Sequence, residues 1–447
     1  MIIVDTALRQ REATGDPIGV ALSGAGFAAQ GLVMQLLGPA SVGMRLRIIA
    51  NRTIETIHTL LDNLDVNDFV EVRTIDELEA AIASETLAIT DDVGLAALAP
   101  DAEVFVEATG TVEYGASAVL LAIASRKHVV LLNAELDATL GPILKVLADR
   151  AGVVLTDVDG DQPGVLMNLK RQVESWGFRP LLLGNIKSLL DHQRNPDTQV
   201  EFARRVWQRP QTVAGFADGS KIAFEMATLA NGTGMGVLQR GMLGPEVRAE
   251  VGEAHRAFDA EQLIAGEGYV DYVLGAEPSF GVFIIGHSEE LWRRRYMEVY
   301  KMGPGPLYTF YAPYHLGPLE TPLTIARVAL FGDATLTPVG DPVVGVIAVA
   351  KRDLEVGDVL DGIGGFCAYG LADNVADSIG LLPMGLSSDC RVLQRVPKGE
   401  PISFSAVRRP RQSVAWDLWD EQRQMAEDRT IGSLDPFNYD TMSDIID

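Results

Sequence analysis

The stretch Ile18-Gly19-Val20-Ala21-Leu22-Ser23-Gly24-Ala25-Gly26-Phe27-Ala28-Ala29-Gln30-Gly31 decides the fold. Its apolar start has the length of a buried parallel strand, and the residues after Gly31 read as the first turns of a helix. Strand, glycine-rich turn and helix in this order form a dinucleotide-binding fingerprint. Gly24 permits the tight turn, and Gly26 lets backbone N–H groups approach a pyrophosphate. The N-terminus of that helix offers free donors to the anion, and Gly24, Gly26 and Phe27 are candidates for binding the cofactor.

The next strand bears on the choice of cofactor. Residues 44–50 are mostly apolar and lead into Asn51-Arg52-Thr53, about 20 residues beyond the motif, where the adenosine ribose is recognised. An acidic residue there would favour NAD, whereas a neutral amide, a cation and a hydroxyl suit a 2′-phosphate. The sequence therefore favours NADP(H) over NAD(H). In the alternative interpretation, Arg52 is a solvated surface residue.

Size and charge restrict the class of protein. The chain has 447 residues, which predicts two or three domains. Its formal net charge of −24 argues against nucleic acid and against anionic membranes as partners. Two cysteines, Cys367 and Cys390, are too few for a disulfide framework and fit a reducing compartment. Without an apparent signal peptide or membrane span, the expected location is cytoplasmic.

Strands alternate with helices as far as about residue 160, which predicts a doubly wound parallel sheet of the Rossmann type. Ligands of such sheets bind at the carboxyl ends of the strands. That rule places five segments at the same edge of the sheet, which we call the rim: the glycine turn, Asn51–Thr53, Thr109–Gly110, Asn133–Glu135 and the acidic loop 157–161. Thr109, Gly110 and Asn133 are accordingly candidates for binding the cofactor.

The predicted fold class is α/β with three domains and a tail. Residues 1–160 form the Rossmann domain, and 161–340 form an α+β substrate domain. Residues 341–410 form a small β-rich module with short strands and glycine turns. The segment 411–447 is an acidic C-terminal tail.

Several motifs together resemble a known group of enzymes. The chain from about residue 16 to 407 resembles the homoserine dehydrogenase-like oxidoreductases, and more closely those joined to a C-terminal SAF domain, among them deoxyxylulose phosphate reductoisomerase-like enzymes. The segments that carry the resemblance are Gly24-Ala25-Gly26, Val106-Glu107-Ala108-Thr109-Gly110, Gly184-Asn185-Ile186-Lys187, Asp218-Gly219-Ser220-Lys221, Asn231-Gly232-Thr233-Gly234, Pro313-Tyr314-His315-Leu316 and, for the SAF part, 349–357. One departure concerns Asn133, which is followed by Ala134 where homoserine dehydrogenases resemble one another in an Asn-Lys pair.

Two lysines are the leading catalytic candidates. Lys187 and Lys221 could donate a proton to a developing alkoxide or stabilise it, because desolvation in a closed cleft lowers a lysine pKa toward neutrality. Alternatively, each is a surface lysine. Glu135 and Asp159 are candidates for acid–base chemistry, and Asp161 for binding substrate hydroxyls.

The acidic loop and two further side chains have alternative interpretations. Glu135, Asp159 and Asp161 could together hold a divalent cation, whereas the loop 157–161 could equally be a capped turn. His315 and Asn231 are candidates for substrate binding. The alternatives are a satisfied core histidine and an amide that serves the turn before Gly232.

Two functions of different class follow. The first is an NADP-dependent oxidoreductase that acts on a small polyhydroxy or sugar-phosphate-like carbonyl compound, with or without a coupled rearrangement, or a homoserine dehydrogenase-like amino-acid enzyme. The second is a non-catalytic nucleotide-binding sensor or assembly protein. Lys187, Lys221 and Glu135 favour the enzyme. We expect a small-molecule substrate and a homodimer or higher homo-oligomer.

Overall fold

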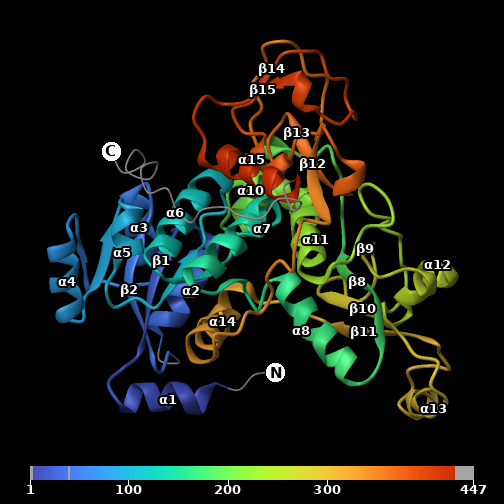
Figure 1. The fold of residues 1–447 in the computed structure, drawn as a ribbon, viewed down its shortest axis with the longest axis horizontal. Coiled ribbons are helices and arrows are strands. Elements are labelled where there is room, and N and C mark those ends of the chain that lie inside the picture. The colour runs from blue at the N-terminus through green and yellow to red at the C-terminus, as the bar shows by residue number, and fades with distance from the viewer. Residues whose placement is uncertain (1–3, 39–40, 428–447) are drawn as a thin grey trace.

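A computed structural model describes residues 4–38 and 41–427. Most of the expected acidic tail, residues 428–447, lies outside the described residues. Figure 1 shows three lobes, with the N-terminal sheet on the left, a second sheet on the right and the C-terminal module at the top. Within the described residues, every helix is too short or too polar to cross a membrane.

The first lobe confirms the Rossmann-type sheet. Seven strands lie in the order β3-β4-β2-β1-β5-β6-β7, and all neighbours are parallel. This is the doubly wound order with β3 added at one edge. The strands are β1 Ile18–Ser23, β2 Met44–Ala50, β3 Phe69–Glu71, β4 Leu87–Thr90, β5 Val104–Glu107, β6 His128–Leu131 and β7 Leu155–Asp157.

Helices cover both faces of this sheet. One face packs α2 Phe27–Leu37 and α3 Ile54–Asn63, and the other packs α4 Ile75–Ala83, α5 Val93–Leu98, α6 Val112–Ala124 and α7 Ala134–Ala151. The helix α1 Asp5–Ala13 precedes β1. The strand β1 is buried along its whole length, as its apolar run predicts for a strand covered on both faces.

The second lobe is a mixed sheet of four strands in the order β11-β10-β8-β9. Its strands are β8 Arg179–Lys187, β9 Tyr269–Leu274, β10 Val282–His287 and β11 Leu307–Ala312, with β8 and β9 parallel and the other pairs antiparallel. Its helices are α8 Gln162–Ser175, α9 Pro196–Arg205, α10 Pro210–Ala217, α11 Ser220–Thr233, α12 Ala260–Ala265 and α13 Leu291–Val299. In α11, every position from Ser220 to Gly232 is buried apart from Lys221.

The chain then returns to the first lobe. Helix α14, Gly317–Phe331, packs on α2, and its Ile325, Ala326 and Val328 belong to the same buried cluster as β1. Beyond it, Leu336 pairs with Asp157 at the end of β7. The predicted boundary at 340 therefore assigns residues 317–336 to the wrong domain, because their apolar side chains complete the core under the first sheet.

The two places where the chain leaves and re-enters the first lobe are in contact. A Cβ on Gly160 would lie 2.9 Å from the carbonyl oxygen of Leu316 and 2.7 Å from Cβ of Glu320. Only glycine fits at this contact between the two crossings.

The C-terminal module is β-rich, as expected. It contains the antiparallel pair β12 Val344–Ala350 and β13 Ala368–Asn374, and the short pair β14 Arg391–Val392 and β15 Val407–Arg408. Helix α15, Val414–Glu427, follows and packs on α6 and α7.

The packing of α15 compensates for a proline in the middle of α7. Pro142 interrupts that helix, and the side-chain amide of Gln422 accepts from Ile143 N at 3.1 Å and donates to Thr139 O at 3.1 Å. Gln422 thereby bonds the backbone on both sides of Pro142, where the proline ring removes a helical hydrogen bond.

Candidate active site

The glycine turn after β1 has the geometry that a dinucleotide site requires. Gly24 has φ +114°, and a Cβ there would lie 2.7 Å from the carbonyl carbon and oxygen of Ala108. Gly26 begins α2 as its N-cap without a side-chain cap, and a Cβ there would meet no atom within 4 Å. Gly24 is thus required by the protein itself, whereas the space beside Gly26 is open at an uncapped helix N-terminus, where an anion binds. Phe27, the first residue of α2, is exposed.

At the carboxyl end of β2, Arg52 and Thr53 are exposed, and Asn51 Nδ2 donates to Thr53 O at 2.8 Å. The Arg52 guanidinium lies over the ring of Tyr114, 6.0 Å from its centroid. Burial raises the pKa of Tyr114 to about 12, and Arg52 opposes that shift. The carboxylates that act on the same ring are Glu107 at the end of β5 and Asp92 and Asp91, which follow β4.

A buried carboxylate organises the rim between β5 and α7. Glu107 accepts from Thr109 N at 2.9 Å and from Asn133 Nδ2 at 2.6 Å. Asn133 also donates to Thr111 O at 3.1 Å and accepts from Leu136 N at 3.1 Å, so both its amide protons are used within the protein. Asn133 therefore shapes the rim and caps α7, and its side chain has no donor left for a cofactor. Burial raises the pKa of Glu107 to about 7.

The structure brings together three of the four residues predicted to be catalytic. Lys221 Nζ, near the start of α11, lies 3.3 Å from Glu135 Oε2 in the first turn of α7. The two side chains are 17% and 12% exposed. This ion pair joins the second lobe to the rim of the first sheet.

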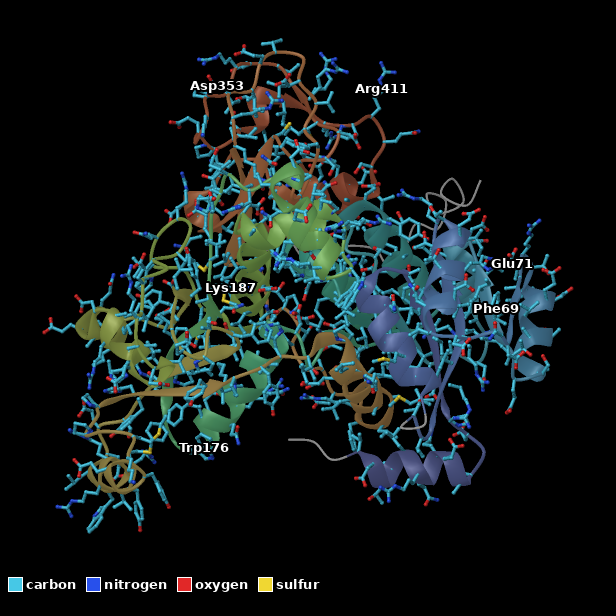
Figure 2. All side chains as sticks on the ribbon, turned by 180° about the vertical axis from the view of Figure 1, so that it is seen from behind. Phe69, Glu71, Trp176, Lys187, Asp353 and Arg411 are labelled. Carbon is cyan, nitrogen blue, oxygen red and sulfur yellow. The ribbon has the colours of Figure 1, made fainter. Side chains whose placement is uncertain are left out.

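Lys187 reaches the same place from the end of β8. Its Nζ lies 3.8 Å from Glu225 Oε2, and Asn185 Nδ2 donates to the same oxygen at 3.1 Å. Figure 2 shows Lys187 near the middle of the molecule, whereas Trp176 lies far below it, toward the other end of the second lobe. We call Lys187, Lys221, Glu135 and Glu225 the lysine–carboxylate cluster.

The electrostatics of the cluster differ from the expectation for a desolvated lysine. Burial alone would lower the pKa of Lys221, but Glu135, Asp161 and Glu225 outweigh it, and the pKa is raised above its usual value. The predicted fall toward neutrality is therefore wrong for Lys221, which stays an ammonium. Burial raises the pKa of Glu225 to about 7, against the opposing effect of Lys187.

Two of the predicted substrate-binding residues face the cluster. Asp161 is the N-cap of α8, where its side chain accepts from Gln162 N at 3.0 Å, and its charge acts on Glu225 and Lys221. His315 stacks on Phe280 with ring centroids 4.3 Å apart. Burial lowers the pKa of His315 to about 4, with Asp161 opposing the shift and Lys187 and Lys221 adding to it. His315 is therefore neutral near pH 7.

Asp159 does not join the cluster. Its carboxylate accepts from Asn168 Nδ2 at 2.6 Å, from Thr324 Oγ1 at 2.9 Å and from Thr335 Oγ1 at 2.8 Å, and it lies 3.5 Å from Arg327 NH1. Because this network fixes α14 and the following segment, a structural role replaces the predicted catalytic one.

Asn231 is also structural. Its Oδ1 accepts from Val343 N at 2.8 Å and Val344 N at 3.1 Å, and its Nδ2 donates to Val344 O at 3.1 Å. The fully buried amide fixes the start of β12, so the predicted substrate contact is not supported.

Glu225 and Glu107 were missed by the sequence-based prediction. Glu225 follows Lys221 by four positions, a spacing that puts both on one face of a helix. Glu107 ends β5 two residues before Thr109, at the rim where ligands bind. In the described part of the chain, no group of three or more His, Cys, Asp or Glu side chains is arranged to hold a metal.

Comparison with known proteins places this site in a class. Residues 160–321 match the family model described as "Oxidoreductase DRL, catalytic domain". The matched range holds both lysines of the cluster and begins where the chain leaves the Rossmann-type sheet. The chain is an NAD(P)-dependent oxidoreductase, and its residues 160–321 are similar to this catalytic domain. The match ends before the C-terminal module, whose SAF-like character stays a prediction. No curated protein matches the chain.

Solved structures with similarity to the chain are distant. A homoserine dehydrogenase from Thiobacillus denitrificans is 17% identical over 76% of this chain and 83% of its own, with a TM-score of 0.41. A probable dehydrogenase from Thermotoga maritima is 11% identical over 72% of this chain and 91% of its own, with a TM-score of 0.41. A DOX-P reductoisomerase in complex with magnesium is 13% identical over 47% and 56%, with a TM-score of 0.33. At these values none of them indicates a substrate.

Proposed function

We propose that the chain is an NADP(H)-dependent oxidoreductase that acts on a small polyhydroxy or sugar-phosphate-like carbonyl compound. The observation that carries this proposal is the Lys221–Glu135 ion pair, which joins the catalytic domain to the rim of the cofactor-binding sheet beside Lys187 and Glu225. Alternating ammonium and carboxylate groups can both donate to and accept from a substrate rich in hydroxyls.

The residues at the first sheet fit a nicotinamide dinucleotide. The uncapped start of α2 and the open space beside Gly26 would hold its pyrophosphate, and Arg52 and Thr53 would hold a 2′-phosphate. The bound cofactor supplies or accepts the hydride.

The protein's own groups manage charge and one proton. Lys221, kept protonated by Glu135, Asp161 and Glu225, stabilises negative charge that develops on the substrate oxygen. Lys187 donates the proton to that oxygen. Glu225, whose pKa of about 7 matches the working pH, exchanges the proton with Lys187 across 3.8 Å.

A substrate panel tests this proposal. Nicotinamide absorbance is followed with NADPH or NADP⁺ in the presence of sugar phosphates, aldonates and homoserine. We expect turnover with at least one hydroxylated carbonyl compound or the corresponding alcohol. Turnover of homoserine alone would replace the proposed substrate class by an amino acid, and no turnover with bound NADP(H) would favour a sensor.

Arg52→Ala tests the preference for NADP(H). Because a hydrogen bond to a charged group is lost, NADP(H) binding should weaken by about 1–3 kcal/mol while NAD(H) binding hardly changes. Cofactor fluorescence titration measures both affinities. The matched control is Arg45→Ala, which removes an arginine paired with Glu12 at the other end of β2 and should leave both affinities unchanged. Equal losses for the two cofactors in Arg52→Ala would refute the assignment.

Glu225→Gln tests the proton-exchange role. The side chains that act on Glu225 are Lys187 from β8, Asp161 from the start of α8, Lys221 from α11 and Glu135 from α7. In the wild type, kcat for carbonyl reduction should fall as pH increases through about 7, because only protonated Glu225 can return a proton to Lys187. The Gln variant should lack this ionisation. In His315→Gln the ionisation should persist, since the pKa of His315 is about 4. An unchanged profile in Glu225→Gln would exclude the role.

A further inference from the structure

One buried lysine of the C-terminal module reaches the segment before α11 in the catalytic domain. Lys351 directly follows β12, and its Nζ lies 2.7 Å from Asp218 Oδ2. The side chains are 4% and 0% exposed. Lys351 Nζ also donates to Arg194 O at 2.7 Å and to Gly365 O at 2.7 Å. Lys351 thus donates two hydrogen bonds to carbonyl oxygens, and the Asp218 carboxylate balances its charge.

The partner of Lys351 shapes the start of α11. Asp218 Oδ1 accepts from Ser220 N at 2.8 Å, across Gly219, which has φ +93°. Lys221 is the next residue along the chain. The carboxylate of Asp218 therefore holds the backbone immediately before the lysine that pairs with Glu135.

A second contact from the module reaches the same turn. In β13, Gly370 N donates to Ser220 Oγ at 2.8 Å. Tyr369 stacks on His192 with ring centroids 4.3 Å apart, and His192 Nδ1 lies 2.7 Å from Asp218 O. The turn 218–220 is thus held by Lys351, which follows β12, and by residues of β13. None of these contacts involves the dinucleotide motif.

We propose that Lys351 is a positioning residue for the reaction, acting through Asp218 on Lys221, so that the C-terminal module is a working part of the active site. This inference rests on the proposed function of Lys221. A buried carboxylate that loses its only ion-pair partner is strongly unfavourable, and the turn must rearrange to relieve it. A rearrangement of about 1 Å at Lys221 is enough to cost about 100-fold in rate.

The test compares variants of the full chain. In Lys351→Met, we expect NADP(H) affinity to stay at the wild-type value and kcat to fall by about 100-fold, the scale of a small misplacement. Amide hydrogen exchange should accelerate in residues 218–225 and stay unchanged in the glycine turn 24–26. Lys351→Arg, which keeps the charge, should recover part of kcat. The matched control is Arg395→Met, which breaks exposed pairs with Asp353 and Glu355 in the same module and should behave as wild type.

Two results would overturn the inference. One is a folded Lys351→Met protein with wild-type kcat, and the other is unchanged exchange in residues 218–225. Hydrogen exchange is measured without a substrate, so it tests the role of Lys351 even if the proposed reaction is wrong. A fully active Lys221→Met variant would show instead that the proposed function of Lys221 is wrong. If Lys351→Met does not fold, Ser220→Ala removes the hydroxyl that accepts from Gly370 N and acts on Asp218, and it leaves Lys351 in place. Wild-type kcat and exchange in that variant would count equally against the proposal.

Discussion

Lys221→Met and Lys187→Met should each lower kcat by about 100- to 10,000-fold, the usual contribution of a group that transfers or stabilises a proton. Methionine preserves the length and much of the volume of the side chain but removes the charge. For Lys221 the loss removes the ammonium that Glu135 holds at 3.3 Å, and for Lys187 it removes the partner of Glu225 at 3.8 Å. Neither lysine contacts the glycine turn, so NADP(H) affinity should be unchanged.

The control for these variants is Lys170→Met. Lys170 lies on α8, is 18% exposed like the two cluster lysines, and pairs with Glu174 on the same helix. Steady-state kinetics and cofactor titration should find it indistinguishable from the wild type. Wild-type rates in both cluster variants would remove the lysines from the mechanism, and a parallel loss of cofactor affinity would indicate general damage to the fold.

Gly24→Ala and Gly26→Ala should fail in different ways. At Gly24, alanine must adopt φ +114° and place Cβ 2.7 Å from the Ala108 backbone. The backbone strain costs about 1–3 kcal/mol, and overpacking adds about 1–3 kcal/mol. We expect a lower thermal midpoint and poor cofactor binding together.

At Gly26 the open space accommodates Cβ, so stability should be retained. Cofactor affinity should still fall by about tenfold or more, equivalent to about 1.4 kcal/mol, because the methyl group occupies the path of the pyrophosphate. Thermal unfolding and cofactor titration of the two variants separate the effects. A stable Gly26→Ala protein with full affinity would show that no dinucleotide lies there.

The first sheet was predictable because its determinants are local. The apolar run before Gly24, the glycines and the alternation of strands and helices are all contiguous in the sequence, and the parallel order follows from crossover rules. Helix α14 was not predictable in this way. Its apolar residues predict a buried face, but only the folded chain shows that the buried face belongs to the first sheet.

The candidate site was predictable to the extent that motifs mark strand and helix ends. Lys187 ends β8 and Lys221 begins α11, and both positions could be inferred from glycine and apolar patterns. Asp159 and Asn231 also lie close to the end of a strand or helix, as the two lysines do. Apart from Asn168, their partners lie more than 100 positions away, at Arg327, Thr324, Thr335 and the backbone at 343–344, so their structural roles depend on tertiary contacts. The raised pKa of Lys221 also depends on tertiary contacts, because Glu135 from α7 and the α8 N-cap Asp161 act on it together with Glu225 from its own helix.

The contact between Gly160 and Leu316 has a consequence for how this chain could be taken apart. Because the chain leaves the first lobe near Gly160 and re-enters it near Leu316, and these two places are in contact, the segment between them is an insertion in the first lobe. The family match to residues 160–321 covers almost the same span. A linker of a few residues between positions 160 and 316 would therefore delete the catalytic segment and leave the strand order of the seven-stranded sheet unchanged. Such a shortened chain would keep the helix α14 that completes the core of the first lobe, whereas cutting the chain at residue 160 would remove it.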